Sequence, residues 1–280
     1  MPTPGLRKEG MKLQKNKFFQ MASAVWEAVA ELLYPPRCPL CDELLLPGSN
    51  TRKRTVLSKT LRQGELPTLR KGICTLCERK LTRIAEPVCK KCGKPLSDER
   101  REYCGDCAGK KHSYRQGKAV FLYKGAMRQS MYRFKYSNRR EYASFYADEA
   151  AVSYADWVRR REIEAIVPIP MYPAKKRRRG YNQAEVFAGA LGQKLQIPVE
   201  TKLVKRTRDT TPQKELSDSQ RKKNLKNAFR VTGDKVVYRQ ILLVDDIYTT
   251  GSTMDAVAEA LLAAGAQNIY YICICIGQGN

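Results

Sequence analysis

The sequence predicts an α/β protein in which a parallel sheet follows a small cysteine-rich domain. Three observations lead to this fold class. Apolar strand-like segments alternate with helix-like segments from Ala119 onward, a pattern typical of parallel sheets. Four Cys-x-x-Cys pairs fall within residues 38–107. An apolar strand ending in two aspartates leads into a Thr-Thr-Gly-Ser-Thr run, which has the form of a phosphate-binding loop.

Size and charge narrow the classes of partner. The 280 residues suggest about two domains, and 52 basic against 28 acidic residues give a formal charge of +24. This excess of positive charge favours nucleic acid, phosphorylated small molecules or an anionic membrane surface as binding partners. The alternative is that the charge only keeps the surface well solvated. No apolar run is long enough to span a bilayer, and no clean export signal is present. We therefore expect a cytoplasmic protein with reduced cysteines.

Composition divides the chain into four parts. Residues 1–19 are expected to form a basic disordered tail, and residues 20–36 an amphipathic helix stopped by two prolines. We favour packing of this helix on the next domain; the alternative is membrane attachment, which would recruit the protein to the inner face of the membrane. Residues 37–110 form the cysteine-rich domain with a long basic insert, and residues 111–280 form the sheet domain.

The cysteine pairs predict two structural zinc sites. A two-residue gap lets both thiolates of a pair reach one ion, and two pairs complete a closed tetrahedral site. We favour sequential pairing, first with second and third with fourth, while interleaved pairing, redox chemistry and disulfides remain alternatives. Metal binding should supply much of the folding energy of this domain. The pairs are Cys38/Cys41, Cys74/Cys77, Cys89/Cys92 and Cys104/Cys107.

The alternation of apolar and amphipathic segments gives the elements of the sheet domain in order. We expect strands at 119–123, 163–169, 236–244 and 269–276, and helices at 125–134, 140–161, 184–195 and 252–264. A polar excursion from Lys205 to Lys226 is a candidate lid over a ligand. Cys273 and Cys275 lie on the last apolar strand and are expected in the core.

The segment Ile241–Thr253 is the strongest candidate ligand site. Ligands of open α/β sheets bind at the carboxyl ends of strands, and the N–H groups of a loop entering a helix hold anions. Carboxylates repel phosphate, so Asp245 and Asp246 suit ribose hydroxyls or a magnesium ion. The alternative is an ordinary strand followed by an acidic N-cap. The site is assigned to Asp245, Asp246, Ile247, Tyr248, Thr249, Thr250, Gly251, Ser252 and Thr253.

This segment resembles the phosphoribosyl pyrophosphate (PRPP) signature of type I phosphoribosyltransferases along its whole length. The resemblance implies that Asp245 and Asp246 hold the ribose and magnesium and that Thr249 to Thr253 cradle the 5′-phosphate. Five consecutive basic residues, Lys175 to Arg179, follow the C-terminal end of a strand and are expected to neutralise pyrophosphate, with a solvated loop as the alternative. The residues assigned to this pyrophosphate site are Arg178, Arg179, Gly180 and Asn182. The expected lid residues are Arg206, Thr210, Pro212 and Gln213.

The order of motifs resembles the ComF family of competence proteins. The motifs are Arg179-Gly180-Tyr181-Asn182-Gln183-Ala184, then Thr210-Thr211-Pro212-Gln213, then the PRPP signature, preceded by cysteine pairs that resemble a double zinc ribbon. The resemblance implies a type I phosphoribosyltransferase-like sheet, two zinc ions, and magnesium with PRPP. It also implies a role in the uptake of transforming DNA, with single-stranded DNA and a helicase-type competence protein as partners.

Two functions are weighed. As an enzyme, the chain would transfer phosphoribose from PRPP to an unidentified acceptor, but no acceptor pocket is recognisable and His112, expected on the surface, is a poor base. As a binding protein, it would use the span 108–140, which holds ten Lys or Arg, no acid and interleaved aromatics, of which Phe121 and Phe134 are expected in the core. The expected DNA-binding residues are Lys110, Lys111, Arg128, Arg133, Lys135, Arg139 and Arg140.

Overall fold

The computed structural model describes residues 35–45, 72–208, 225, 227–233 and 235–277. The expected basic tail, nearly all of the expected amphipathic helix and most of the basic insert lie outside these residues. So do the lid residues Thr210, Pro212 and Gln213. Within the described part of the chain, no helix combines the length and apolar character needed to cross a membrane.

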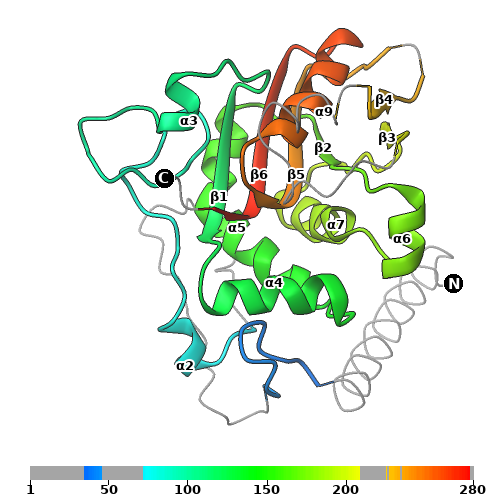
Figure 1. The fold of residues 1–280 in the computed structure, drawn as a ribbon. Coiled ribbons are helices and arrows are strands. Elements are labelled where there is room, and N and C mark those ends of the chain that lie inside the picture. The colour runs from blue at the N-terminus through cyan, green and yellow to red at the C-terminus, as the bar shows by residue number, and fades with distance from the viewer. Residues whose placement is uncertain (1–34, 46–71, 209–224, 226, 234, 278–280) are drawn as a thin grey trace, which may run out of the picture.

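A four-stranded parallel sheet forms the centre of the described structure (Figure 1). Its strands lie in the order β1-β6-β5-β2, so β5 and β6 are the inner pair. Parallel pairing along all three ladders confirms the predicted α/β class. The strands are β1 (Gln116–Leu122), β2 (Ala165–Pro168), β5 (Gln240–Tyr248) and β6 (Asn268–Ile276).

Helices cover both faces of the sheet and create two core layers. Leu242 and Val244 of β5 belong to the layer shared with α4 (Ala126–Tyr136), α5 (Tyr142–Arg160) and α7 (Gln183–Leu195). Ile241 and Leu243 belong to the opposite layer, with α9 (Ser252–Ala263). Because successive side chains of a strand point to opposite faces, the continuous apolar run of β5 fills both layers.

The predicted bounds of β5 are wrong at both ends. The prediction placed the strand at 236–244, whereas it spans Gln240–Tyr248. It continues past Val244 because β6 still offers pairing partners there, from Asp245 with Cys273 to Tyr248 with Ile276. The aspartates therefore lie inside the second half of the strand and are held by its ladder.

Two further elements differ from expectation. The basic run forms a helix, α6 (Pro173–Arg179), which begins with a proline at its first turn and ends at Gly180 with φ of 86°. The polar excursion is bracketed by an unexpected antiparallel pair, β3 (Val204–Arg206) and β4 (Phe229–Val231). Cys273 and Cys275 are fully buried, which confirms their core role.

Candidate functional site

The eight paired cysteines form two clusters that fit zinc. Within each cluster, the four sulfur atoms lie within 4.8 Å of one another. The Sγ atoms of Cys41 and Cys74 are 3.8 Å apart, and those of Cys92 and Cys104 are 3.6 Å apart. Zinc with sulfur at about 2.3 Å in a tetrahedron requires sulfur atoms about 3.8 Å apart. The clusters are Cys38/Cys41/Cys74/Cys77 and Cys89/Cys92/Cys104/Cys107, so sequential pairing is confirmed.

The two clusters pack on opposite layers of the sheet domain. Cys38 and Cys77 join the layer of α4 and α5, while Cys89 and Cys92 join the layer of α9. The first cluster, with its short helix α2 (Thr75–Glu78), is here called the first ribbon, and the second, with α3 (Gly105–Ala108), the second ribbon. Each ribbon is therefore part of the core rather than an appendage.

The acidic pair, Asp245 and Asp246, lies just beyond the point where β2 stops pairing with β5. The last ladder partners are Pro168 and Val244, so Asp245 and Asp246 stand beyond the end of β2 at the carboxyl edge of the sheet. Lys135 of α4 forms an ion pair with Asp246 at 2.9 Å, and these side chains are only 20% and 13% exposed. The structure thus brings Lys135, which was predicted to bind nucleic acid, against the acidic pair.

Asp245 has an unusual protonation equilibrium. Burial of its carboxyl and the neighbouring charge of Asp246 raise its pKa to about 7, although Lys135 and Arg206 act in the opposite direction. The backbone N–H of Asp246 donates to Asp245 Oδ1 at 2.8 Å and also favours the charged form. The pair offers carboxylate oxygens that suit magnesium, but the ion must compete with the ammonium of Lys135 and with a proton.

The loop between β5 and α9 has the features of an anion cradle. Gly251 adopts φ of 80°, and a Cβ there would lie 2.5 Å from the hydroxyl of Tyr248, so only glycine fits. The hydroxyls of Thr250 and Ser252 are 3.1 Å apart. Thr249 is exposed and Thr253 is half-buried at the start of the helix. The loop therefore presents hydroxyls and the positive end of a twelve-residue helix.

The four residues expected to bind pyrophosphate make different contacts. Arg178 is exposed, whereas Arg179 donates to Gln183 at 2.6 Å and lies over the ring of Tyr136. The Gly180 carbonyl accepts from Arg140. Asn182 caps α7, because its Oδ1 accepts from the Ala184 N–H at 3.1 Å while its Nδ2 donates to the Ile169 carbonyl at 2.9 Å. Asparagine directly before a helix is a capping signal that the sequence reasoning missed.

One lid residue lies in the described structure. Arg206 ends β3, and its guanidinium lies over the ring of Phe229 on β4, 5.4 Å from the ring centre. The same charge lowers the pKa of Asp245, which relates the base of the polar excursion to the acidic pair. Arg206 therefore stays a candidate ligand residue at the base of the excursion.

The expected nucleic-acid residues separate into three groups. Arg133 donates to the Leu40 carbonyl and Arg139 pairs with Asp42 at 2.8 Å, so both hold the first ribbon. Lys110 contacts Thr250 in the loop between β5 and α9, and Lys135 contacts Asp246 of the acidic pair. The exposed members are Lys111, Arg128 and Arg140. Phe121 and Phe134 are fully buried as expected, while Tyr132 and Tyr136 are exposed.

The expectation that His112 lies on the surface is wrong. Its side chain has no exposed area, and its Nδ1 is 2.9 Å from Asp255 Oδ2 in the first turn of α9. The ring also stacks on Tyr114 at 4.7 Å between centroids. The error arose because the partner carboxylate lies 143 residues further along the chain. No local pattern around His112 signals such a contact.

Comparison with known proteins matches both parts of the structure. Residues 64–108 match the family model of a double zinc ribbon domain, and residues 182–279 match that of a phosphoribosyl transferase domain. The first model covers three of the four cysteine pairs, and the second covers the inner strands β5 and β6 of the sheet.

Relatives with known names match along most of the chain. Competence protein F of Haemophilus influenzae is 32% identical, with coverage of 74% of this chain and 91% of that protein. The DNA utilization protein YhgH of Escherichia coli K12 is 33% identical, covering 73% and 90%. Competence protein ComFC of Bacillus subtilis is 26% identical, covering 69% and 79%. With two zinc-ribbon clusters joined to a phosphoribosyltransferase-like sheet, this chain belongs to the ComF family of competence protein F.

Proposed function

We propose that this protein acts in DNA uptake in the cytoplasm, together with a helicase-type partner. In this role it binds PRPP with magnesium at one site and single-stranded DNA at another. The names of its relatives, competence proteins and a DNA utilization protein, support the role. The observation that carries the ligand is the acidic pair followed by a glycine-hinged loop at the carboxyl edge of β5. This segment lies within the region matched to the phosphoribosyl transferase family.

The chemistry of PRPP suits the two halves of this site. Its 5′-phosphate would accept hydrogen bonds from N–H groups and hydroxyls of Thr249 to Thr253, aided by the dipole of α9. Its ribose hydroxyls would donate to Asp245 and Asp246. Asp245 and Asp246 would also hold magnesium, whose charge would offset that of the pyrophosphate and replace the charge that Lys135 now supplies to Asp246.

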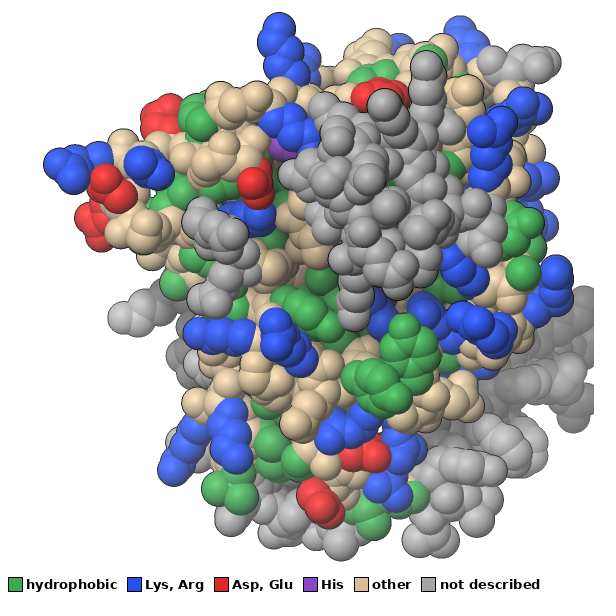
Figure 2. Space-filling view, in the orientation of Figure 1, with side chains coloured by type: hydrophobic (Ala, Val, Ile, Leu, Met, Phe, Trp, Pro, Cys, Tyr) green, Lys and Arg blue, Asp and Glu red, His purple; other side chains and the backbone are tan. Residues whose placement is uncertain are grey.

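The DNA-binding part of the proposal rests on one exposed surface. Arg128, Tyr132 and Tyr136 recur every four residues and share one face of α4. Tyr132 and Tyr136 are 62% and 60% exposed with ring centroids 5.1 Å apart, and Arg179 extends the stack. Figure 2 shows hydrophobic side chains over α4 bordered by Lys and Arg. We name Arg128, Tyr132, Tyr136, Arg140, Arg178 and Arg179 the α4–α6 surface.

Such a surface suits single-stranded DNA because bases stack on aromatic rings while phosphates pair with guanidinium groups. The Arg179 guanidinium lies 4.8 Å from the Tyr136 ring centre, so stacking and charge are already adjacent. Two of the seven basic residues first expected to bind DNA belong to this surface, and α6 adds others. The surface therefore differs from the sequence prediction in its composition, although both propose the same ligand class.

Two binding measurements test the proposal. Calorimetry with PRPP and magnesium should show binding to the wild type and none to the double variant Asp245→Ala/Asp246→Ala, which should still bind single-stranded DNA. Tyr132→Ala and Tyr136→Ala should each weaken DNA binding about tenfold, since stacking supplies ~1–3 kcal/mol per base. Tyr103→Ala is the matched control, because Tyr103 is also exposed but lies on the second ribbon. Equal effects of all three tyrosine variants would refute the DNA surface.

The match of residues 182–279 to the phosphoribosyl transferase family supports phosphoribosyl transfer as a second candidate function. A carboxyl with a pKa of about 7, as on Asp245, is suited to exchanging protons at neutral pH. A pyrophosphate-release assay with PRPP, magnesium and candidate acceptors separates the two functions. Release that depends on the acceptor and is lost in Asp245→Asn supports an enzyme; binding without release supports the binding protein.

A further inference from the structure

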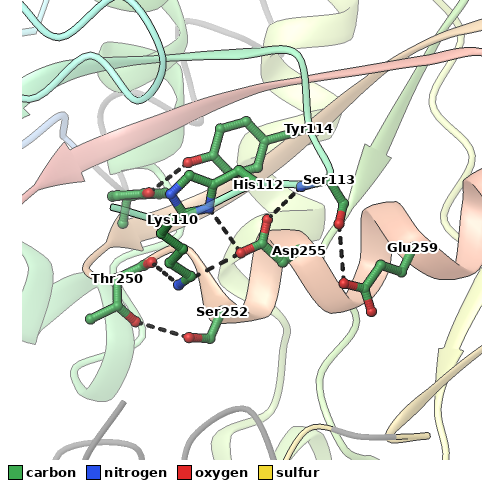
Figure 3. A network of polar contacts seen from close by, with 9 residues as sticks. Lys110, His112, Ser113, Tyr114, Thr250, Ser252, Asp255 and Glu259 are labelled. Carbon is green, nitrogen blue, oxygen red and sulfur yellow. Dashed lines mark hydrogen bonds and ion pairs between the residues drawn. The ribbon is translucent and has the colours of Figure 1, made fainter. Parts of the chain in front are cut away.

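The segment from Lys110 to Tyr114 connects the second ribbon in space with residues 249–253, which we call the phosphate loop. It follows α3, which contains the zinc ligand Cys107, and leads into β1. Figure 3 shows the side chains of Lys110, His112 and Ser113 directed at the loop and at the first turns of α9. Lys110 Nζ donates to the carbonyl of Thr250 at 3.1 Å. A residue at the exit of the ribbon therefore touches the centre of the proposed phosphate cradle.

Asp255 holds this segment in place. Its Oδ1 accepts from the backbone N–H of Ser113 at 2.9 Å, and its Oδ2 lies 2.9 Å from His112 Nδ1. The same Oδ2 is 3.7 Å from Lys110 Nζ. Asp255 is itself buried, and the side chain of Lys110 is only 18% exposed. The ammonium is therefore held between a buried carboxylate and one loop carbonyl, unlike the exposed Lys111 beside it.

The contact with Thr250 fixes the direction of a neighbouring N–H. The peptide between Thr250 and Gly251 is planar, and in a trans peptide the C=O and the N–H point to opposite sides. When Lys110 holds the Thr250 carbonyl toward the ribbon, the Gly251 N–H points away from the ribbon. Because glycine has no Cβ, Gly251 can adopt negative as well as positive φ, and its φ is positive here. The peptide before it can therefore take more than one orientation, and an external restraint selects one.

A second connection supports the base of the same loop. The hydroxyl of Tyr271 donates to the carbonyl of the zinc ligand Cys92 at 2.7 Å. Tyr271 stacks on Tyr248 at 4.9 Å between centroids, and the Tyr248 hydroxyl is 2.7 Å from that of Tyr114. Since Tyr248 packs directly beneath Gly251, the second ribbon restrains the loop from below as well as through Lys110.

We propose that Lys110 is a positioning residue of the phosphate loop, by which the second ribbon orients the Gly251 N–H for an anionic ligand. The identity of that ligand as PRPP rests on the proposed function. The role assigned to Lys110 differs from a general attraction between a basic surface and an anion. It requires the specific hydrogen bond to Thr250, and a neighbouring lysine without that bond cannot supply it.

The test compares Lys110→Met with Lys111→Met, which remove the same charge from adjacent positions. In the ligand-free chain, hydrogen exchange measured by mass spectrometry should speed up in the peptides covering residues 249–253 in Lys110→Met only. Calorimetry with PRPP and magnesium should give a dissociation constant raised roughly tenfold or more, the fold-change expected for losing a hydrogen bond from a charged donor. Lys111→Met should stay within about twofold of wild type, as a single exposed charge has little effect.

Equal exchange in the two variants would overturn the inference, even if both bind PRPP less well. If wild type fails to bind PRPP while the exchange difference persists, the ligand assignment is wrong and the role of Lys110 in the loop stands. Asp255→Asn provides a second variant that keeps Lys110 and the shape of its partner. It should raise exchange in the same peptides, and its effect combined with Lys110→Met should be less than additive because both act on one network.

Discussion

Replacing Lys135 with methionine should destabilise the protein in a manner that depends on pH. The ion pair with Asp246 at 2.9 Å has a gross Coulomb energy of about 6 kcal/mol at an effective dielectric constant of ~20. Breaking a buried pair costs ~3–5 kcal/mol, and since a fifth of Lys135 is exposed we expect the lower end, about 3 kcal/mol, at pH 8. Methionine keeps most of the apolar stem, so the lost charge dominates.

The pH dependence follows from the raised pKa of Asp245. Its folded-state pKa is about 7 against a reference of 3.8, so its ionisation weakens the fold progressively as pH rises from about 4 to 7. Because Lys135 lowers this pKa, the Lys135→Met variant should have a still higher one. At pH 6 the Asp245 carboxyl is mostly neutral in both folded proteins, so the loss of Lys135 changes its free energy little. At pH 8 the ionised form dominates in wild type, and without Lys135 that form is less stable, although Arg206 still acts on it. A rise of about one unit in the pKa of Asp245 makes the loss of stability ~1 kcal/mol larger at pH 8 than at pH 6.

Urea unfolding at pH 6 and pH 8 measures both effects. Lys124→Met is the matched control, because Lys124 is exposed and its removal changes the net charge equally. The control should lose less than about 0.5 kcal/mol at either pH. An identical loss at both pH values in Lys135→Met, or a loss no larger than that of the control, would refute the electrostatic role of Lys135.

Three further predictions concern the metal, the loop and the ligand. Cys92→Ser should lower the zinc content from two ions to one per chain by elemental analysis, since it breaks only one of two clusters. Gly251→Ala should abolish detectable PRPP binding in calorimetry, because a Cβ would meet the Tyr248 hydroxyl at 2.5 Å; Tyr248→Phe in the same chain should restore part of it. The affinity for PRPP with magnesium should fall up to tenfold per pH unit below about 7, as Asp245 takes up a proton, and Asp245→Asn should remove this dependence.

Local patterns in the sequence predicted the elements that depend on local physics. The two-residue gaps of the cysteine pairs predicted the two cysteine clusters, since a tight turn is enough to bring the two thiols of a pair together. The apolar runs predicted the four parallel strands, and the Thr-Thr-Gly-Ser-Thr run predicted the loop before α9. The end of β5 was missed because it depends on how far β6 continues beside it, which is information from another part of the chain.

The polar contacts that shape the site were not predictable in the same way. Lys135 meets Asp246 and Lys110 meets Thr250 across more than a hundred residues. An acid-free basic stretch looked like one surface, whereas the fold directs its lysines and arginines to the first ribbon, the acidic pair, the phosphate loop and solvent. A run of basic residues predicts a region of positive charge. It does not predict the partner of each residue, because tertiary packing determines which groups meet.

Helix α4 links the two proposed binding activities, and this linkage makes a last prediction. Its outer face carries Tyr132 and Tyr136, while Lys135 between them reaches Asp246. Magnesium arriving with PRPP would take the place of Lys135 at Asp246 and release an anchor of the helix that we propose contacts DNA. Coupling between two ligands is reciprocal, so saturating PRPP should change the dissociation constant for single-stranded DNA by the same factor by which DNA changes that for PRPP. Paired titrations measure both factors. A change in DNA affinity that persists in Lys135→Met would show that the linkage does not pass through this ion pair.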